Sequence, residues 1–137
     1  MNSLKVVRDF IEVVLNQEKY DEIDMYISPH FQTHSLHINP KPVTLGNPPK
    51  SFKEALIQSG SALSNFRRKI EDIFADKDKV VVRWISTAKH TGNFMGIPAT
   101  NKEINFSGMS IYRVKYGKIV DEWYVWDRQG LMEQLNK

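Results

Sequence analysis

The stretch KIVDEWYVWDRQGL, residues Lys118 to Leu131, decides how the second half of the chain folds. Its β-branched and aromatic residues are typical of a strand, yet it also carries three carboxylates. Carboxylates are poor strand formers and costly to bury, so each of them needs a reason. Side chains alternate along a strand, which separates these residues into two faces. One face holds Asp121, Trp123, Val125 and Asp127, and the other holds Glu122, Tyr124 and Trp126.

The preceding segments supply further strands and, before them, helices. Apolar spacing predicts helices over 3–16, 20–27 and 51–63, the last opened by a Ser51–Glu54 capping box. An extended segment is expected at 31–37, and the proline-rich residues 39–50 form a loop. Strands are expected at 67–75, 80–90, 103–114 and 118–127, followed by a helical segment at 128–136.

Helices followed by a run of antiparallel strands predict an α+β domain. A curved antiparallel sheet wrapped around the N-terminal helices forms a cone, and such a cone encloses a cavity. We therefore expect one domain over residues 1–137 with a cavity on the concave side of its sheet. Assuming no bulge, we place Trp84, His90, Trp123 and Asp127 around that cavity. A β-bulge would reverse part of this assignment. Phe106 and Met95 are expected nearby, with Phe10 and Val14 closing the narrow end.

The composition narrows the class of protein. The chain has 137 residues, a net charge of +3 and no cysteine. The mild, dispersed basic excess argues against nucleic acid as a partner, and no window is apolar enough to span a membrane. Without cysteine there is no disulfide and no thiolate metal site. We expect a cytoplasmic protein.

Several motifs in residues 90–135 resemble one known family. They are a His-Thr-Gly, a Phe-Met-Gly-Ile-Pro loop, an Ile-Tyr-Arg before a Gly-Lys-Ile hairpin, and an acidic-x-Trp motif ending in Trp-Asp. Together they resemble the SnoaL-like polyketide cyclases, which have the nuclear-transport-factor-like cone fold shared with ketosteroid isomerase. The upstream Phe31-x-x-His34 also fits. The resemblance implies a small dimer that binds an apolar, oxygenated molecule without metal or cofactor.

The resemblance also implies roles for particular residues. In characterised cyclases an aspartate of the final strand is the base for an intramolecular aldol closure, and the matching position is Asp127. The pocket histidines correspond to His34 and His90. From the sequence alone, Asp127 fits two roles, a base in an apolar site or an N-cap of the terminal helix. Asp121 is expected to pair with Arg113 across the hairpin.

Two classes of function fit these features. The first is an enzyme, cyclase-like (an ester cyclase) or an isomerase or epoxide hydrolase, in which Asp127 removes a proton next to a carbonyl while His34 or His90 holds the enolate oxygen. The second is a non-catalytic carrier or sensor of a hydrophobic metabolite. No metal is expected, because His30, His34 and His37 lack ligand spacing on an extended segment. A homodimer is expected through the convex face, with Glu122, Tyr124 and Trp126 beside Arg83, Ile85 and Thr87.

Overall fold

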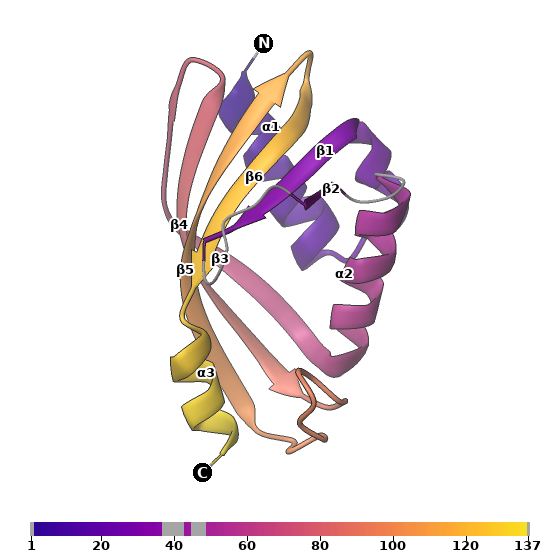
Figure 1. The fold of residues 1–137 in the computed structure, drawn as a ribbon, viewed down its shortest axis with the longest axis vertical. Helices are drawn as coiled ribbons and strands as arrows, with labels where there is room; N and C mark the ends of the chain where they lie inside the picture. Colours follow the sequence, from indigo (N-terminus) through magenta and orange to yellow (C-terminus); the bar gives the residue numbers. More distant parts are fainter. Residues whose placement is uncertain (1, 37–42, 45–48, 137) are drawn as a thin grey trace.

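The computed structural model describes residues 2–36, 43–44 and 49–136, and they form an α+β cone. Six strands lie in one sheet in the order β2-β1-β6-β5-β4-β3, and the helices α1 and α2 cover one side of it (Figure 1). The helical elements are α1 (Ser3–Asp9), η1 (Phe10–Asn16), η2 (Tyr20–Met25), α2 (Lys50–Ala62) and α3 (Arg128–Leu135). The strands are β1 (Ile27–Ser35), β2 (Val43–Thr44), β3 (Leu63–Asp76), β4 (Lys79–His90), β5 (Glu103–Lys115) and β6 (Lys118–Trp126).

The sheet is mixed, whereas the sequence predicted an antiparallel one. Strands β3 to β6 pair antiparallel through successive connections, as expected. The difference lies at β1, which pairs parallel with β6. The chain passes through η2 before β1 and later returns through the whole β3–β6 meander, so its first and last long strands meet side by side in the same direction.

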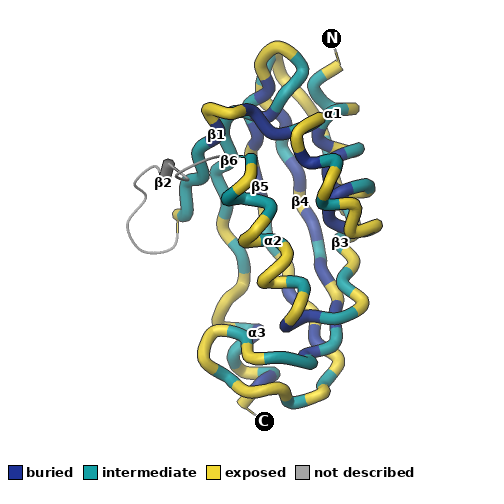
Figure 2. The backbone as a smooth tube through the Cα atoms, turned by 90° about the vertical axis from the view of Figure 1, so that its right-hand side faces the viewer, coloured by how far each residue is buried: buried dark blue, intermediate teal, exposed yellow. Residues whose placement is uncertain are grey.

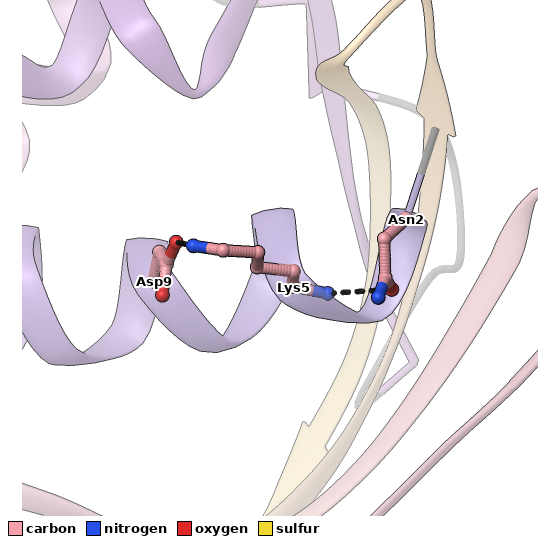
Figure 3. Close-up of polar contacts among 3 residues, drawn as sticks. All are labelled: Asn2, Lys5 and Asp9. Carbon is pink, nitrogen blue, oxygen red and sulfur yellow. Dashed lines mark hydrogen bonds and ion pairs between the residues drawn. The ribbon is translucent and has the colours of Figure 1, made fainter.

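The N-terminal helix begins one residue after a side-chain cap. Asn2 Oδ1 accepts a hydrogen bond from the Lys5 backbone N–H at 3.1 Å, and the Lys5 ammonium pairs with Asp9 one turn later (Figure 3). Asn2 is therefore the N-cap residue of this helix. The helix continues without a break into the π-helical turns of η1, which fits the single helix predicted over 3–16.

The third helix begins one residue before its predicted start. The helix α2 begins at Lys50 with Pro49 as its N-cap residue, so Ser51 lies in the first turn and not at the N-cap position that the predicted capping box requires. Most of the predicted loop 39–50 and the end of the extended segment at His37 lie outside the described residues.

Strand β4 alternates strictly between the two sides of the sheet. Its inward residues are buried and the intervening ones are exposed or half-buried, a pattern that Figure 2 shows along the tube. The predicted shared face of Val80, Val82, Trp84 and His90 is confirmed. On β5 the buried alternate positions include Ile104, Phe106, Ser110, Tyr112 and Val114.

A bulge in β6 decides which of its side chains face inward. Val114 pairs with Ile119 next to the turn, but Arg113 pairs with Asp121, which leaves Val120 as an extra residue. Beyond the bulge Tyr112 pairs with Glu122, so both side chains lie on the inner face. The predicted inward placement of Trp123 is therefore wrong. The inward residues of this strand are Ile119, Glu122, Tyr124 and Trp126.

Gly108 on β5 gives the inner indole its space. It is the register partner of Trp84, and a Cβ at this position would lie 2.5 Å from Trp84 Cζ2 and 2.7 Å from the Val125 carbonyl oxygen. Real Cβ atoms do not approach a rigid ring or a backbone oxygen that closely. The absence of a side chain at Gly108 therefore allows Trp84 to lie flat against the sheet.

We predict that Gly108→Ala destabilises the fold by about 1–3 kcal/mol, since either the indole or strand β6 must move. The measurement is urea unfolding followed by circular dichroism. Ser107→Ala is the matched control, because Ser107 is exposed on the same strand, and its stability should stay within about 0.5 kcal/mol of wild type. Equal stability of the two variants would show that Trp84 is free to move.

Candidate functional site

A cavity of about 380 Å³ lies between the concave face of the sheet and the helices. Its wall is largely aromatic and aliphatic, and a small number of polar groups, most of them on β3, β5 and β6, interrupt it. This composition is typical of a small-molecule site. The residues that line it are Phe10, Leu15, Tyr20, Thr33, Phe52, Ala55, Leu56, Ser59, Gly60, Leu63, Phe66, Arg68, Trp84, Phe94, Phe106, Ser110, Tyr112, Glu122, Tyr124 and Trp126.

Glu122 is the one carboxylate among these lining residues. It reaches the cavity because the bulge turns it inward opposite Tyr112. Desolvation raises the pKa of Glu122, and the Arg68 charge, the Tyr112 hydroxyl and the Ser110 hydroxyl oppose this rise without cancelling it. A carboxylate with a raised pKa beside an apolar cavity is suited to accept a proton from a bound molecule.

Arg68 brings the positive charge to the same cavity. Its guanidinium lies over the indole of Trp84 at 3.6 Å from the ring centroid, and its Nε donates to Ser86 Oγ at 2.9 Å. The backbone of Arg68 is fixed as well, because the Asn16 side-chain amide bonds both its N–H and its carbonyl, at 2.6 and 2.9 Å. Desolvation lowers the pKa of Arg68, and the nearby Tyr112 and Glu122 partly offset this effect.

Tyr112 completes the polar cluster on β5. Its hydroxyl is buried and has no hydrogen bond of regular geometry to another described residue. Desolvation is the main cause that raises the pKa of Tyr112, followed by the Glu122 charge, so the phenol stays protonated. The neighbouring Ser110 Oγ accepts a bond from Trp84 Nε1 at 3.1 Å, which fixes the indole.

The aromatic wall is held by ring contacts. Phe106 lies edge-on to Trp84 at 6.0 Å between centroids and close to Trp126 at 5.3 Å. On the opposite wall Phe52 stacks on Phe31 at 4.9 Å. These packed rings give the cavity flat apolar surfaces, which favour a flat apolar ligand.

Three of the predicted ligand-contact residues line the cavity, and three do not. Phe10, Trp84 and Phe106 line it as predicted. Val14 is fully buried in the core behind the wall. Met95 is 40% exposed in the β4–β5 connection, where its neighbour Phe94 reaches the cavity instead.

The sixth residue, Trp123, lies on the outer face together with His34. The two rings stack at 4.8 Å between centroids, and His34 Nε2 lies 2.9 Å from Asp121 Oδ1. Asp121 also pairs with Arg113 at 3.3 Å, so the predicted cross-hairpin ion pair is confirmed. Because the outer face does not border the cavity, His34 cannot hold a ligand oxygen there.

His90 lies at the inner end of β4 but outside the cavity wall. Its ring is fully buried, and Nδ1 accepts from the Thr100 N–H at 3.3 Å and lies 2.9 Å from Thr100 Oγ1. Nε2 has no partner among the described residues. This arrangement anchors the end of the β4–β5 connection to the core.

Asp127 caps the terminal helix. Its Oδ1 accepts from the Gly130 N–H at 2.9 Å, the second of the two roles that the sequence allowed. The residue is exposed, so the predicted apolar surroundings of its carboxylate are wrong. The bulge explains the difference, because it places position 127 and Trp123 away from the inner face.

The polar residues of the site were not predicted from the sequence. Arg68 stands in the run Arg67-Arg68-Lys69, which reads as an exposed basic run. Tyr112 and Glu122 could have been found together, since a two-residue turn at Tyr116-Gly117 makes these positions near neighbours across the hairpin. Only the bulge makes them direct partners.

Two further findings concern other kinds of site. Among the residues the structure describes, no group of three or more acidic, His or Cys side chains is placed to hold a metal ion. None of the described helices has the length and apolar character needed to cross a membrane.

Comparison with known proteins assigns the chain to a family. The model of the SnoaL-like polyketide cyclases matches residues 5–135, and the chain therefore belongs to this family. No curated protein matches the chain.

Solved structures share the fold along nearly the whole chain. A candidate polyketide cyclase from Acidithiobacillus ferrooxidans is 25% identical, with a TM-score of 0.81 over 98% of this chain and 94% of its own. IdmH, a candidate polyketide cyclase from Streptomyces antibioticus, is 19% identical, with a TM-score of 0.82 over 100% of both chains. AclR, a candidate hydroxylase from Streptomyces galilaeus, is 21% identical, with a TM-score of 0.83 over 98% of this chain and 85% of its own.

The raised pKa of Glu122 predicts how stability depends on pH. The folded state holds this proton more tightly than the unfolded chain, so the stability that the group contributes is complete below the ordinary value of 4.5 and is lost as the pH rises through the folded value. A glutamine at this position would imitate the protonated side chain. We therefore expect Glu122→Gln to gain stability relative to wild type as the pH rises above 4.5.

The measurement is urea unfolding of both proteins over a series of pH values. Glu71→Gln is the matched control, because Glu71 is exposed on β3, and its curve should run parallel to that of wild type. A Glu122→Gln curve that is also parallel to wild type would mean that the carboxylate is not desolvated in solution.

Proposed function

We propose that this protein binds a small, apolar, oxygen-bearing molecule in its cavity and removes a proton from a carbon next to a carbonyl. In a polyketide-like substrate this step would begin an aldol-type ring closure. The observation that carries the proposal is the placement of Glu122, a desolvated carboxylate on the wall of an aromatic cavity. Membership of the SnoaL-like polyketide cyclase family supports it.

The chemistry follows from the position of the acid. A C–H bond next to the carbonyl breaks, the proton passes to the Glu122 carboxylate, and the electron pair moves to the carbonyl oxygen to give an enolate. The base is therefore assigned to Glu122 and not to Asp127, which is exposed and already accepts the Gly130 N–H. The acceptor of the proton belongs to the chain, so the step needs no cofactor.

Exchange of carbon-bound hydrogen tests this step directly. We predict that the protein accelerates the exchange of the α-hydrogens of 2-tetralone in D₂O, as followed by proton NMR. Because general-base catalysis contributes about 10²–10⁴-fold, Glu122→Gln should slow the exchange by at least about 10²-fold. Asp127→Asn should retain the wild-type rate per folded molecule, since asparagine is also a good N-cap.

The matched control is again Glu71→Gln, which should exchange at the wild-type rate. If Asp127→Asn loses the exchange activity and Glu122→Gln retains it, the base is Asp127 and not Glu122. Binding of 2-tetralone without any exchange by wild type would favour the second candidate function, a carrier of hydrophobic molecules. Isomerase chemistry would begin with the same proton abstraction and is distinguished by its product.

We also propose a homodimer that packs through the convex face of the sheet. The aromatic residues expected there are inside the cavity, but another apolar patch takes their place. Met109, Ile111 and Val125 are 51%, 38% and 40% exposed, and Met109 pairs in register with Val125. The nearby Arg83 and Asp121 already have ion-pair partners within the chain, so the patch suits a second copy of itself better than a charged partner.

Sedimentation equilibrium at micromolar concentration tests this assembly. Wild type should be a dimer, and Met109→Glu should be a monomer because it buries a charge at the centre of the contact. Ile57→Glu is the matched control, since Ile57 is 46% exposed on α2 at the other side of the molecule. A monomeric wild type would contradict the proposal.

A further inference from the structure

The cavity contains hydrogen-bond donors that the described residues leave poorly satisfied. The Arg68 guanidinium donates from Nε to Ser86, and its charge acts on Glu122 without a direct ion pair among the described residues. The Tyr112 hydroxyl is buried close to Glu122 and Ser110, but its geometry to them is not that of a regular hydrogen bond. Burying a charge and a polar group in this way costs free energy unless something else compensates them.

Both donors are held in place before a ligand arrives. The stacking of Arg68 on Trp84, its bond to Ser86 and the clamp of Asn16 on its backbone leave the guanidinium little freedom. Tyr112 is rigid for a different reason, because it is fully buried between its neighbours on the sheet. Fixed donors of this kind stabilise an anion without a cost for reorganising themselves.

We propose that Arg68 and Tyr112 form an oxyanion site, and that the cavity selects flat monoanions held with Glu122 in its protonated form. The inference rests on the proposed function, in which this cavity is the ligand site. It assigns the enolate oxygen to two residues that the sequence did not suggest, in place of His34 and His90. The anion has two sources, an enolate formed in the cavity from a neutral ketone or a flat carboxylate that enters already charged.

The charges around the cavity explain why Glu122 must be protonated when an anion binds. The ionisable residues in the wall are Arg68 from β3, Tyr112 from β5, Glu122 and Tyr124 from β6, and Tyr20 from η2. The part of the wall that α2 supplies is uncharged. With Glu122 ionised, Arg68 is neutralised and a second anion is repelled. With Glu122 protonated, Arg68 is the one charge among the described residues of the wall, and an anion balances it.

Isothermal titration of wild type with 2-naphthoate and its neutral isostere 2-naphthamide tests the proposal. Below the pKa of Glu122 the naphthoate should bind at least about tenfold more tightly, because its hydrogen bonds to the donors are charge-assisted. Above that pKa its affinity should fall as the ionised carboxylate repels it, while that of the amide stays constant. Above that pKa, titrations in buffers of different ionisation enthalpy should show proton uptake with naphthoate and none with naphthamide, because only naphthoate requires the ionised Glu122 to take up a proton.

Three variants assign the effect to residues. Arg68→Gln should bind the two compounds with equal affinity, whereas Arg67→Gln, on the exposed side of the same strand, should behave as wild type. Tyr112→Phe should weaken naphthoate several-fold and leave naphthamide unchanged, and it keeps the test valid if Arg68→Gln does not fold. Glu122→Gln should bind naphthoate without proton uptake and without the loss of affinity at high pH.

Equal or weaker binding of naphthoate by wild type overturns the proposal, as does proton uptake that persists in Glu122→Gln. The outcome is separable from that of the proposed function. If the α-hydrogens of 2-tetralone are exchanged but naphthoate binds no more tightly than naphthamide, the oxyanion site is wrong and the assignment of Glu122 as the base is retained. If naphthoate binds with proton uptake but the α-hydrogens of 2-tetralone are not exchanged, the oxyanion site is retained and the catalytic proposal is wrong.

Discussion

The pairing between β5 and β6 contains one residue too many on the β6 side, and the chemistry of the cavity depends on this bulge. Next to the turn, Ile119 faces the core and pairs with Val114. After the extra residue Val120, the acid that faces inward is Glu122 and not Asp121. The bulge therefore satisfies two opposing requirements, since Ile119 is buried on the inner face while Asp121 reaches Arg113 on the outer one.

The neighbours of Glu122 explain how a carboxylate is tolerated at this position. Arg68, Tyr112 and Ser110 each favour its charged form, and desolvation outweighs them. Arg68 itself depends on Trp84, whose indole depends in turn on the missing side chain of Gly108. The polar cluster and the aromatic wall are therefore coupled through packing. A change in the packing of the Trp84 indole should change the pKa of Glu122, because it moves the Arg68 guanidinium.

Much of the fold could be predicted from the sequence, because its patterns were strong and local. The alternation at 80–90 indicated the inner face of β4, and the family motifs indicated the cone. The faces of 118–127 could not be assigned in this way, since both carry an indole and both carry an acid. Periodicity then gives no preference, and a one-residue bulge reverses the result. The inward position of Arg68 could not be predicted for a related reason. An arginine between two basic neighbours is expected to be solvated, and only the structure shows that β3 turns it inward and that Asn16 fixes its backbone.

The chemistry proposed for the cavity requires Glu122 to be a desolvated acid, and the titration of this side chain in solution tests that requirement. The side-chain carboxyl carbon of Glu122, assigned by its absence from the spectrum of Glu122→Gln, can be followed by carbon-13 NMR as the pH is raised. The structure predicts a midpoint above the ordinary value of 4.5. A midpoint at or below 4.5 would mean that this carboxylate is solvated and ion-paired, and that the inner face of β6 does not hold the base.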